Sequence, residues 1–140
     1  MKIRQAKLGD AQALTTLVTV LGYFITKEAL VRHLERSSHP LLVAEEVDGR
    51  LIGYIEAETY DTILTEELMY NVLGLAVATD RQDSGIGGQL LEALEVDALA
   101  HGIKTVRLNS GVDRHLAHEF YEKHGYISQK MQKRFLKSLL

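Results

Sequence analysis

The chain has no cysteine and a single proline among its 140 residues. The first absence excludes disulfide bonds, cysteine-ligated zinc and a cysteine nucleophile, and the second excludes a proline-rich linker. Long hydrophobic runs are also missing, and residues 1–7 alternate and carry charge, so we expect a soluble cytoplasmic protein with no membrane partner. A formal net charge of −3 lacks the basic excess that nucleic-acid binders normally show, so we expect no nucleic-acid partner.

The length suits one hydrophobic core rather than two. Hydrophobic residues make up 46% of the chain and charged residues 25%, which are ordinary values for a globular protein. We therefore expect a single domain over residues 1–140.

Hydrophobic periodicity predicts alternating strands and helices along the chain. Asp10 and Thr26 are expected N-caps, and Gly22, Gly102 and Gly125 are expected helix ends. The expected helices cover residues 11–21, 26–36, 86–101 and 114–124, and the expected strands cover residues 2–7, 41–47, 51–59, 69–78, 104–109 and 126–136. Strands 41–47 and 51–59 are joined by Asp48-Gly49, a strong hairpin signal, and strand 104–109 should return parallel to strand 69–78.

The most informative stretch is Val72–His101, where an apolar strand breaks into a glycine-rich turn that opens a helix. Such a turn binds anions because its backbone N–H groups have no intrahelical partner. A triphosphate-binding P-loop would need Lys-Ser or Lys-Thr after Gly87, which is absent. A dinucleotide fold would need a third glycine where Leu90 stands and an acid at the end of the next strand, and it has neither.

A third pattern, Gln/Arg-x-x-Gly-x-Gly/Ala, fits Gln82-Asp83-Ser84-Gly85-Ile86-Gly87 at every fixed position. Leu75-x-Val77 precedes it, and the later segment Ala117–Tyr126 fits Ala-x-x-Phe/Leu-Tyr-Glu-Lys-x-Gly-Phe/Tyr. With these motifs the chain resembles the GNAT superfamily of N-acetyltransferases over nearly its whole length. The resemblance implies an α/β (α+β) single-domain fold with a mixed central sheet of about six or seven strands flanked by about four helices.

The resemblance also implies acetyl coenzyme A as the acetyl donor. In the family the turn amides bind the pyrophosphate, while the preceding strand pairs with the pantetheine arm. The residues in these roles would be Leu75, Ala76, Val77, Gln82, Asp83, Ser84, Gly85, Ile86, Gly87 and Gly88. Many relatives also place a pantetheine-binding Asn about seven residues before the tyrosine of the second motif. Arg114 stands there instead, so Asn109 or Ser110 is the expected substitute, or Arg114 itself reaches the phosphates.

Amine acetylation needs a base for the amine, a donor for the oxyanion and an acid for the departing thiolate. Tyr121 resembles the family's tyrosine acid, although it also belongs to a helix stripe typical of a core. Glu56 and Glu58 share a strand face with Tyr54 and are candidate bases, with a solvated sheet face as the alternative. The oxyanion donor is expected on residues 73–77, where a bulge would free a backbone N–H.

The leading hypothesis is acetyl transfer to a primary amine of a small molecule or a protein. The acids near the expected site suit a cationic acceptor such as a polyamine or an aminoglycoside. The alternative is a non-catalytic acyl coenzyme A sensor on the same fold. No metal is expected, because His118-Glu119 lacks the second histidine of a His-Glu-x-x-His helix and has Glu122 there. The resemblance to the family also implies a homodimer, for which the sequence itself holds no signal.

Overall fold

A computed structural model describes residues 1–140, which form two compact units, Met1–Leu108 and Asn109–Leu140. The first unit contains a five-stranded sheet in the order β1-β2-β3-β4-β5, in which β4 and β5 are parallel and the other neighbours antiparallel. Its strands are β1 Lys2–Gln5, β2 Leu41–Glu45, β3 Leu51–Tyr60, β4 Met69–Val77 and β5 Val106–Leu108, and its helices are α1 Ala11–Thr19, α2 Lys27–Arg36 and α3 Ile86–Ala100. The second unit contains α4 His115–Lys123.

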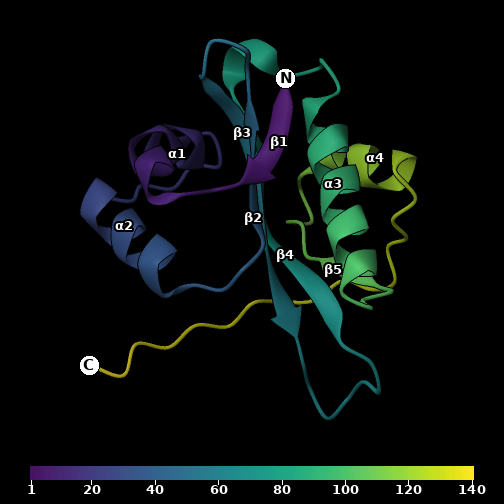
Figure 1. The fold of residues 1–140 in the computed structure, drawn as a ribbon. Coiled ribbons are helices and arrows are strands. Elements are labelled where there is room, and N and C mark those ends of the chain that lie inside the picture. The colour runs from purple at the N-terminus through teal and green to yellow at the C-terminus, as the bar shows by residue number, and fades with distance from the viewer. The chain divides into compact units, whose positions relative to one another are not determined.

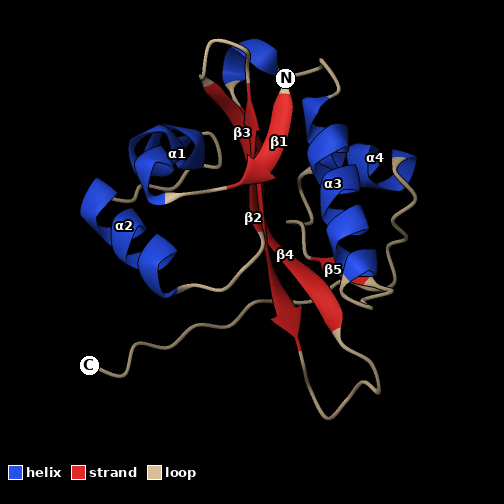
Figure 2. Ribbon diagram, viewed as in Figure 1, coloured by secondary structure: helices blue, strands red, loops and turns tan.

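In the first unit, helices cover both faces of the sheet: α1 and α2 lie on one face and α3 on the other (Figures 1 and 2). Side chains alternate across β3, so Tyr54 and Glu56 face α1 and α2 while Gly53 faces α3. A Cβ on Gly53 would come within 2.9 Å of Leu90 Cδ1, so this glycine lets α3 pack closely on the sheet. The most deeply buried large side chains come from α1, the sheet and α3, and include Leu14, Val43, Ile52, Ile55, Leu90, Leu91 and Leu94.

The helix ends follow the sequence closely. Thr26 caps α2 by accepting a hydrogen bond from the N–H of Ala29 at 3.1 Å. Gly22, Gly102 and Gly125 follow three of the helices with φ angles of +83°, +75° and +92°. These left-handed conformations end helices at low cost because glycine has no Cβ.

Asp10 precedes α1 as expected, but its side chain makes no capping hydrogen bond there. Its carboxylate instead accepts two hydrogen bonds from Arg4, at 2.8 and 3.0 Å, and one from the N–H of Lys7 at 2.9 Å. Asp10 therefore occupies the predicted N-cap position of α1, but its carboxylate binds Arg4 and Lys7 instead of the first turn of the helix. The Arg4 hydrogen bonds hold the pKa of Asp10 below its ordinary value, and the residue is only 6% exposed.

The mixed α/β fold is confirmed, with five strands rather than six or seven. The expected strand at 126–136 does not form, and its apolar residues Ile127, Met131 and Phe135 are 81% or more exposed. An alternating sequence forms a strand only where a neighbouring strand satisfies its backbone groups, and none pairs with this segment. The strand expected at 104–109 is shortened to β5.

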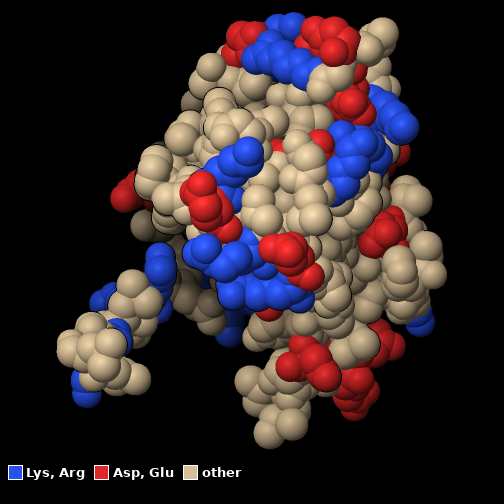
Figure 3. Space-filling view, turned by 60° about the vertical axis from the view of Figure 1, so that its left-hand side comes forward, with Lys and Arg blue, Asp and Glu red and all other residues tan.

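None of the helices is long and apolar enough to cross a bilayer. On the face of the first unit that carries α1 and α2, groups of Lys and Arg adjoin groups of Asp and Glu (Figure 3). The two charge signs are thus interspersed there.

Candidate active site

Strand β4 carries a bulge and, beyond it, an unpaired edge. Glu56 on β3 lies opposite Gly74, but the next pair in the ladder skips Leu73, which is an extra residue on β4. On its other edge β4 pairs with β5 only over residues 70–72. Residues 73–77 therefore have no strand on that outer edge, and their backbone groups there lie outside the sheet ladder. The bulge falls within the segment for which the sequence predicts one.

The turn after β4 directs backbone N–H groups toward the start of α3. Thr79–Arg81 form a short 3-10 turn, and Asp83 and Gly85 have positive φ angles of +64° and +86°. Gly85 is the N-cap residue of α3, and the N–H groups of the first helical turn after it have no intrahelical partner. The side-chain amide of Gln82 donates to the carbonyl oxygen of Val77 at 3.2 Å and ties the turn to β4. This backbone arrangement suits an anion.

Two arginines next to the turn are held in ion pairs. Arg50 donates to both oxygens of Asp80, at 2.8 and 2.7 Å, and these hydrogen bonds lower the pKa of Asp80 to about 2. Arg81 donates to Glu46 at 3.0 and 3.2 Å and to Asp80 at 3.1 Å. The Arg81 cation thus lies beside the expected phosphate site with two carboxylates already bound to it.

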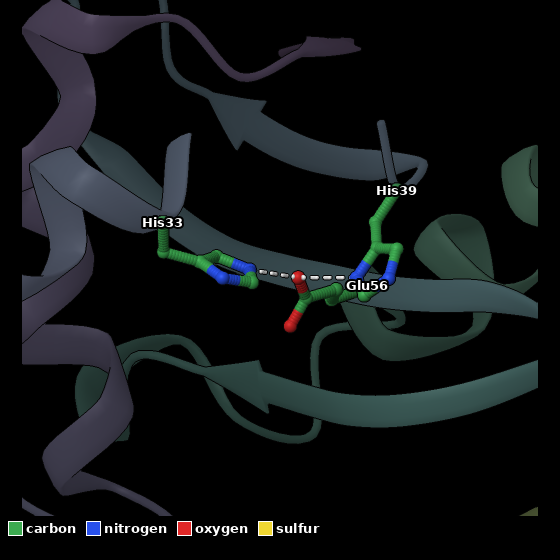
Figure 4. A group of neighbouring side chains, drawn as sticks. All are labelled: His33, His39 and Glu56. Atoms are coloured by element: carbon green, nitrogen blue, oxygen red, sulfur yellow. Dashed lines mark hydrogen bonds and ion pairs between the residues drawn. The ribbon is translucent and has the colours of Figure 1, made fainter. Parts of the chain in front are cut away.

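Glu56 lies at the centre of a cluster with two histidines (Figure 4). Its Oε2 atom is 2.5 Å from His33 Nε2 and 3.1 Å from His39 Nδ1. His33 comes from α2, His39 from the segment between α2 and β2, and Glu56 from β3. The side chains of all three are half-buried. The predicted base is thus not a freely solvated acid.

A cavity of about 200 Å³ lies between α1, α2 and the sheet, beside this cluster. Its wall consists of Leu14, Val18, Ile25, Leu30 and Leu41, together with His33, Tyr54 and Glu56. Burial, and then the Glu56 charge, raise the pKa of Tyr54 to about 12, so the phenol is protonated at neutral pH. A Cβ on Gly74 would lie 2.7 Å from Tyr54 Oη, so this hydroxyl packs against the strand next to the bulge.

Glu58, the other candidate base, is in a different environment. Its Oε2 accepts a hydrogen bond from the Asn71 side-chain amide at 2.8 Å, and Asn71 Oδ1 accepts one from Arg107 at 3.3 Å. The Arg107 guanidinium lies 4.3 Å from the centre of the Tyr60 ring. Glu58 therefore belongs to a polar chain across β3, β4 and β5 and does not line the cavity.

The second unit holds the remaining predicted residues. Tyr121 is half-buried on α4, with its ring 5.2 Å from Phe120 and 6.0 Å from Tyr126 between centroids. Burial raises the pKa of Tyr121, and the charge of Arg114 opposes that shift. Arg114 precedes the first residue of α4, and Asn109 is exposed at the start of this unit.

The sequence analysis missed the link between Glu56 and the two histidines. The sequence places Glu56 on a strand face, but the packing of α2 against that face, which brings His33 to Glu56, is a tertiary contact. Periodicity places a side chain on one face of its own element and does not say which other element packs there. On α4, His118 Nε2 lies 2.8 Å from the Gly111 carbonyl oxygen, within hydrogen-bond distance.

Residues 13–126 match the model of the acetyltransferase (GNAT) family. The chain belongs to this family. The match covers both motifs that the sequence analysis identified, and it confirms the resemblance. The GNAT family generally uses acetyl coenzyme A. No curated protein matches the chain in sequence.

Solved structures share the fold of this GNAT protein at low sequence identity. The aminoglycoside 6'-N-acetyltransferase AAC(6')-Ih from Acinetobacter baumannii has a TM-score of 0.81 and 17% identity, covering 99% of this chain and 98% of that one. The ribosomal-protein-alanine N-acetyltransferase from Brucella melitensis biovar Abortus 2308 has a TM-score of 0.81 and 19% identity, covering 98% and 100%. An aminoglycoside acetyltransferase from an uncultured soil metagenomic sample, in complex with trehalose, has a TM-score of 0.81 and 19% identity, covering 99% and 96%. Their acceptors differ, so the shared fold does not identify the acceptor here.

Proposed function

We propose that the protein transfers an acetyl group from acetyl coenzyme A to a primary amine of a small molecule or a protein. The observation that carries this proposal is the outer edge of β4, which is unpaired over residues 73–77 and leads directly to the Gly85 turn and α3. An extended amide chain can pair with such an edge as an added strand. A diphosphate at its far end would meet the free N–H groups of the helix start.

On the donor side, the amides of the turn bind the pyrophosphate and the strand binds the pantetheine arm. Leu75 and Val77 supply backbone groups to pantetheine, with Ala76 buried between them. Residues 82–88 supply the N–H groups for the phosphates. Asn109 and Arg114 are the proposed further contacts of the coenzyme A arm and phosphates, in place of the family's usual Asn.

On the acceptor side, we assign the base to Glu56 rather than Glu58. Glu56 lines the cavity and lies opposite Gly74, beside the bulge where the thioester carbonyl would be. Glu58 is instead bound to the Asn71 amide. Both rings contact Oε2 of Glu56, which leaves Oε1 for an amine proton (Figure 4).

The reaction balances with these groups. The amine nitrogen attacks the thioester carbonyl carbon, Glu56 takes a proton from the nitrogen, and the oxyanion is stabilised by a backbone N–H at the Leu73 bulge. The C–S bond then breaks, and the thiolate takes the phenolic proton of Tyr121. A phenol with the ordinary pKa of about 10 is protonated at neutral pH, and burial raises the pKa of Tyr121 further, so the proton is present when the thiolate forms.

The cavity favours a particular kind of amine. Five of its eight lining residues are aliphatic, and the polar groups are His33, Tyr54 and Glu56. A site with an apolar wall and a few polar groups orients a ligand by its polar end. We therefore infer an acceptor with an apolar body next to its amine, such as a phenylalkylamine or an alkylamine, in preference to an aminoglycoside or polyamine.

The test is thiol release from acetyl coenzyme A with a panel of amines, using wild type, Glu56→Gln and the matched control Glu58→Gln. We expect Glu56→Gln to lower kcat by about 10²- to 10⁴-fold, the usual contribution of a general base, and Glu58→Gln to leave it within a few-fold. Tyr121→Phe should lower kcat. The comparison variant is Tyr54→Phe, which removes the hydroxyl of a second buried tyrosine.

Three results would contradict parts of the proposal. Equal losses in Glu56→Gln and Glu58→Gln would refute the assignment of the base. A lower kcat in Tyr54→Phe but not in Tyr121→Phe would assign the role of the acid to Tyr54 on β3. Stoichiometric coenzyme A binding with no turnover across the panel would favour the acyl coenzyme A sensor instead.

A further inference from the structure

Three segments that are separate in the sequence bring donor atoms to one point in the first unit. The metal-binding atoms that His33, His39 and Glu56 can offer all lie within 4.8 Å of one another. Figure 4 shows the two imidazole rings pointing at Glu56 from opposite sides, with a nitrogen of each directed at the same carboxylate oxygen. No role in acetyl transfer requires two histidines on one carboxylate oxygen.

The donor atoms lie closer together than they would around a bound dication. Zinc binds imidazole nitrogen and carboxylate oxygen at about 2.0–2.2 Å in a tetrahedral arrangement, which places neighbouring donor atoms about 3.3–3.6 Å apart. The distances from Glu56 Oε2 are 3.1 Å to His39 Nδ1 and 2.5 Å to His33 Nε2. Side-chain rotations that move the two imidazole nitrogens away from Oε2 to this spacing would open the cluster to a tetrahedral site.

The orientation of the rings also fits. The His33 and His39 rings are 5.8 Å apart between centroids with planes at 68°, so they are edge to face rather than stacked. Two imidazoles in this arrangement can each direct a nitrogen lone pair toward a common ion. A second histidine pair, His115 and His118 on α4, has nearly the same ring geometry, 5.9 Å and 79°, and provides a control.

Charge and access favour an ion as well. Glu56 brings a carboxylate to the cluster, and its ion-pair partners are the two imidazoles. The three side chains are 28%, 31% and 18% exposed, so an ion can reach them. The adjacent cavity leaves room for a water as fourth ligand. Two imidazoles and one carboxylate, with an open fourth position, are a ligand set that favours Zn²⁺ over Mg²⁺ or Ca²⁺.

We propose that His33, His39 and Glu56 form a binding site for Zn²⁺ or a similar transition-metal dication. Metal binding occupies the carboxylate to which we assign the amine proton. Zn²⁺ should consequently inhibit acetyl transfer by competing with the acceptor amine, and this part rests on the proposed function. The site itself does not depend on it.

The test uses the full chain, first freed of metal with a chelator and then titrated with Co²⁺ and with Zn²⁺. We expect Co²⁺ to give the visible absorption of a tetrahedral site without thiolate charge-transfer bands, and Zn²⁺ to bind with a stoichiometry of one by calorimetry. His33→Gln and His39→Gln should each weaken Zn²⁺ binding at least about tenfold, since even outer-shell changes cost 10- to 100-fold. The double variant His115→Gln/His118→Gln should bind as tightly as wild type.

Three outcomes would overturn the proposed site. The site is refuted if no tetrahedral Co²⁺ spectrum appears, if the spectrum persists in His33→Gln/His39→Gln, or if the control variant loses it equally. Circular dichroism and thermal unfolding in chelator establish that each variant is folded before titration. If Zn²⁺ binds at this site and acetyl transfer is unaffected, the site stands and the assignment of Glu56 as base falls. If no metal binds, the proposed acetyl transfer is untouched.

Discussion

Adding one methyl group at Gly74 should destabilise the protein through a single, identifiable contact. A Cβ at this position would lie 2.7 Å from Tyr54 Oη, while the next ring atom, Tyr54 Cζ, would be 3.4 Å away. Tyr54 is only 7% exposed, so its ring has little room to move. Overpacking of this kind costs about 1–3 kcal/mol.

Gly74→Ala also has a smaller effect that stabilises the protein. The φ angle of Gly74 lies outside the left-handed region, so alanine can adopt the backbone conformation. Replacing glycine by alanine then stabilises by about 0.4–1 kcal/mol through the unfolded chain. Gly74→Ala should therefore lower the free energy of unfolding by about 1–2 kcal/mol. In a Tyr54→Phe background the 2.7 Å contact disappears, and Gly74→Ala should be neutral or slightly stabilising.

Equilibrium urea unfolding of the four proteins in this double-mutant cycle measures the coupling free energy, which we expect to equal the overpacking cost of about 1–3 kcal/mol. Gly53→Ala is the control, because its Cβ would meet Leu90 and the Ala76 carbonyl oxygen instead, at 2.9 and 3.1 Å. Its cost should be the same with Tyr or Phe at position 54. A coupling below about 0.5 kcal/mol for Gly74→Ala would refute the placement of the Tyr54 hydroxyl beside the bulge.

Three further predictions follow from other contacts in the first unit. Asp10→Asn should lower the free energy of unfolding by about 2–3 kcal/mol at pH 7, because hydrogen bonds to a charged and poorly exposed carboxylate are lost. The control is Asp48→Asn, in an exposed turn, which should change the free energy of unfolding by less than about 0.5 kcal/mol. The folded-state pKa of Asp10 is lowered, so its contribution to stability is present above the unfolded pKa of about 3.9 and is lost as the pH falls through the lower folded value. Below pH 4 the free energy of unfolding of Asp10→Asn should therefore depend less on pH than that of wild type. An equal dependence on pH in the two proteins would contradict this. Leu94→Ala, at a residue with no exposure, should lower the free energy of unfolding in urea by about 2–5 kcal/mol. Val96→Ala on the same helix, at a residue 62% exposed, should lower it by less than about 0.5 kcal/mol. Similar losses in the two variants would contradict the orientation of α3. Leu30→Asn in the cavity wall should raise the KM for a phenylalkylamine about tenfold, the equivalent of 1.4 kcal/mol, without changing the Kd for coenzyme A, and an unchanged KM would place the acceptor elsewhere.

The helices and the hairpin could be predicted because their signals are local. The buried stripe of α3, which includes Leu90 and Leu94, repeats with the helical period, and glycines stand where helices end. Gly49 has a φ angle of +91° in the turn between β2 and β3. A strand carries a weaker signal, because alternation alone does not provide a partner. This is why residues 126–136 were assigned a strand that does not form.

The candidate site also has one part with a local sequence signal and one part without. The turn at residues 82–87 is a contiguous motif, and the structure places it between β4 and the start of α3, as expected. The cluster of His33, His39 and Glu56 depends on how α2 packs against β3. His39 and His33 are 17 and 23 positions before Glu56 in the sequence. Sequence periodicity predicts that a side chain points inward but not which other side chain it meets.

The difference between the predicted and observed β5 bears directly on the donor site. The sequence predicts a strand at residues 104–109, but β5 has three residues and pairs with β4 only as far as Val72. A parallel strand of ordinary length would continue along β4 past the bulge and occupy the backbone groups that we assign to pantetheine. The bulge at Leu73 falls directly after the last paired residue, so the two features together leave residues 73–77 unpaired on that edge. The early end of β5 is therefore a requirement of the proposed donor site, and a chain that extended this strand would lose the site while keeping the sheet.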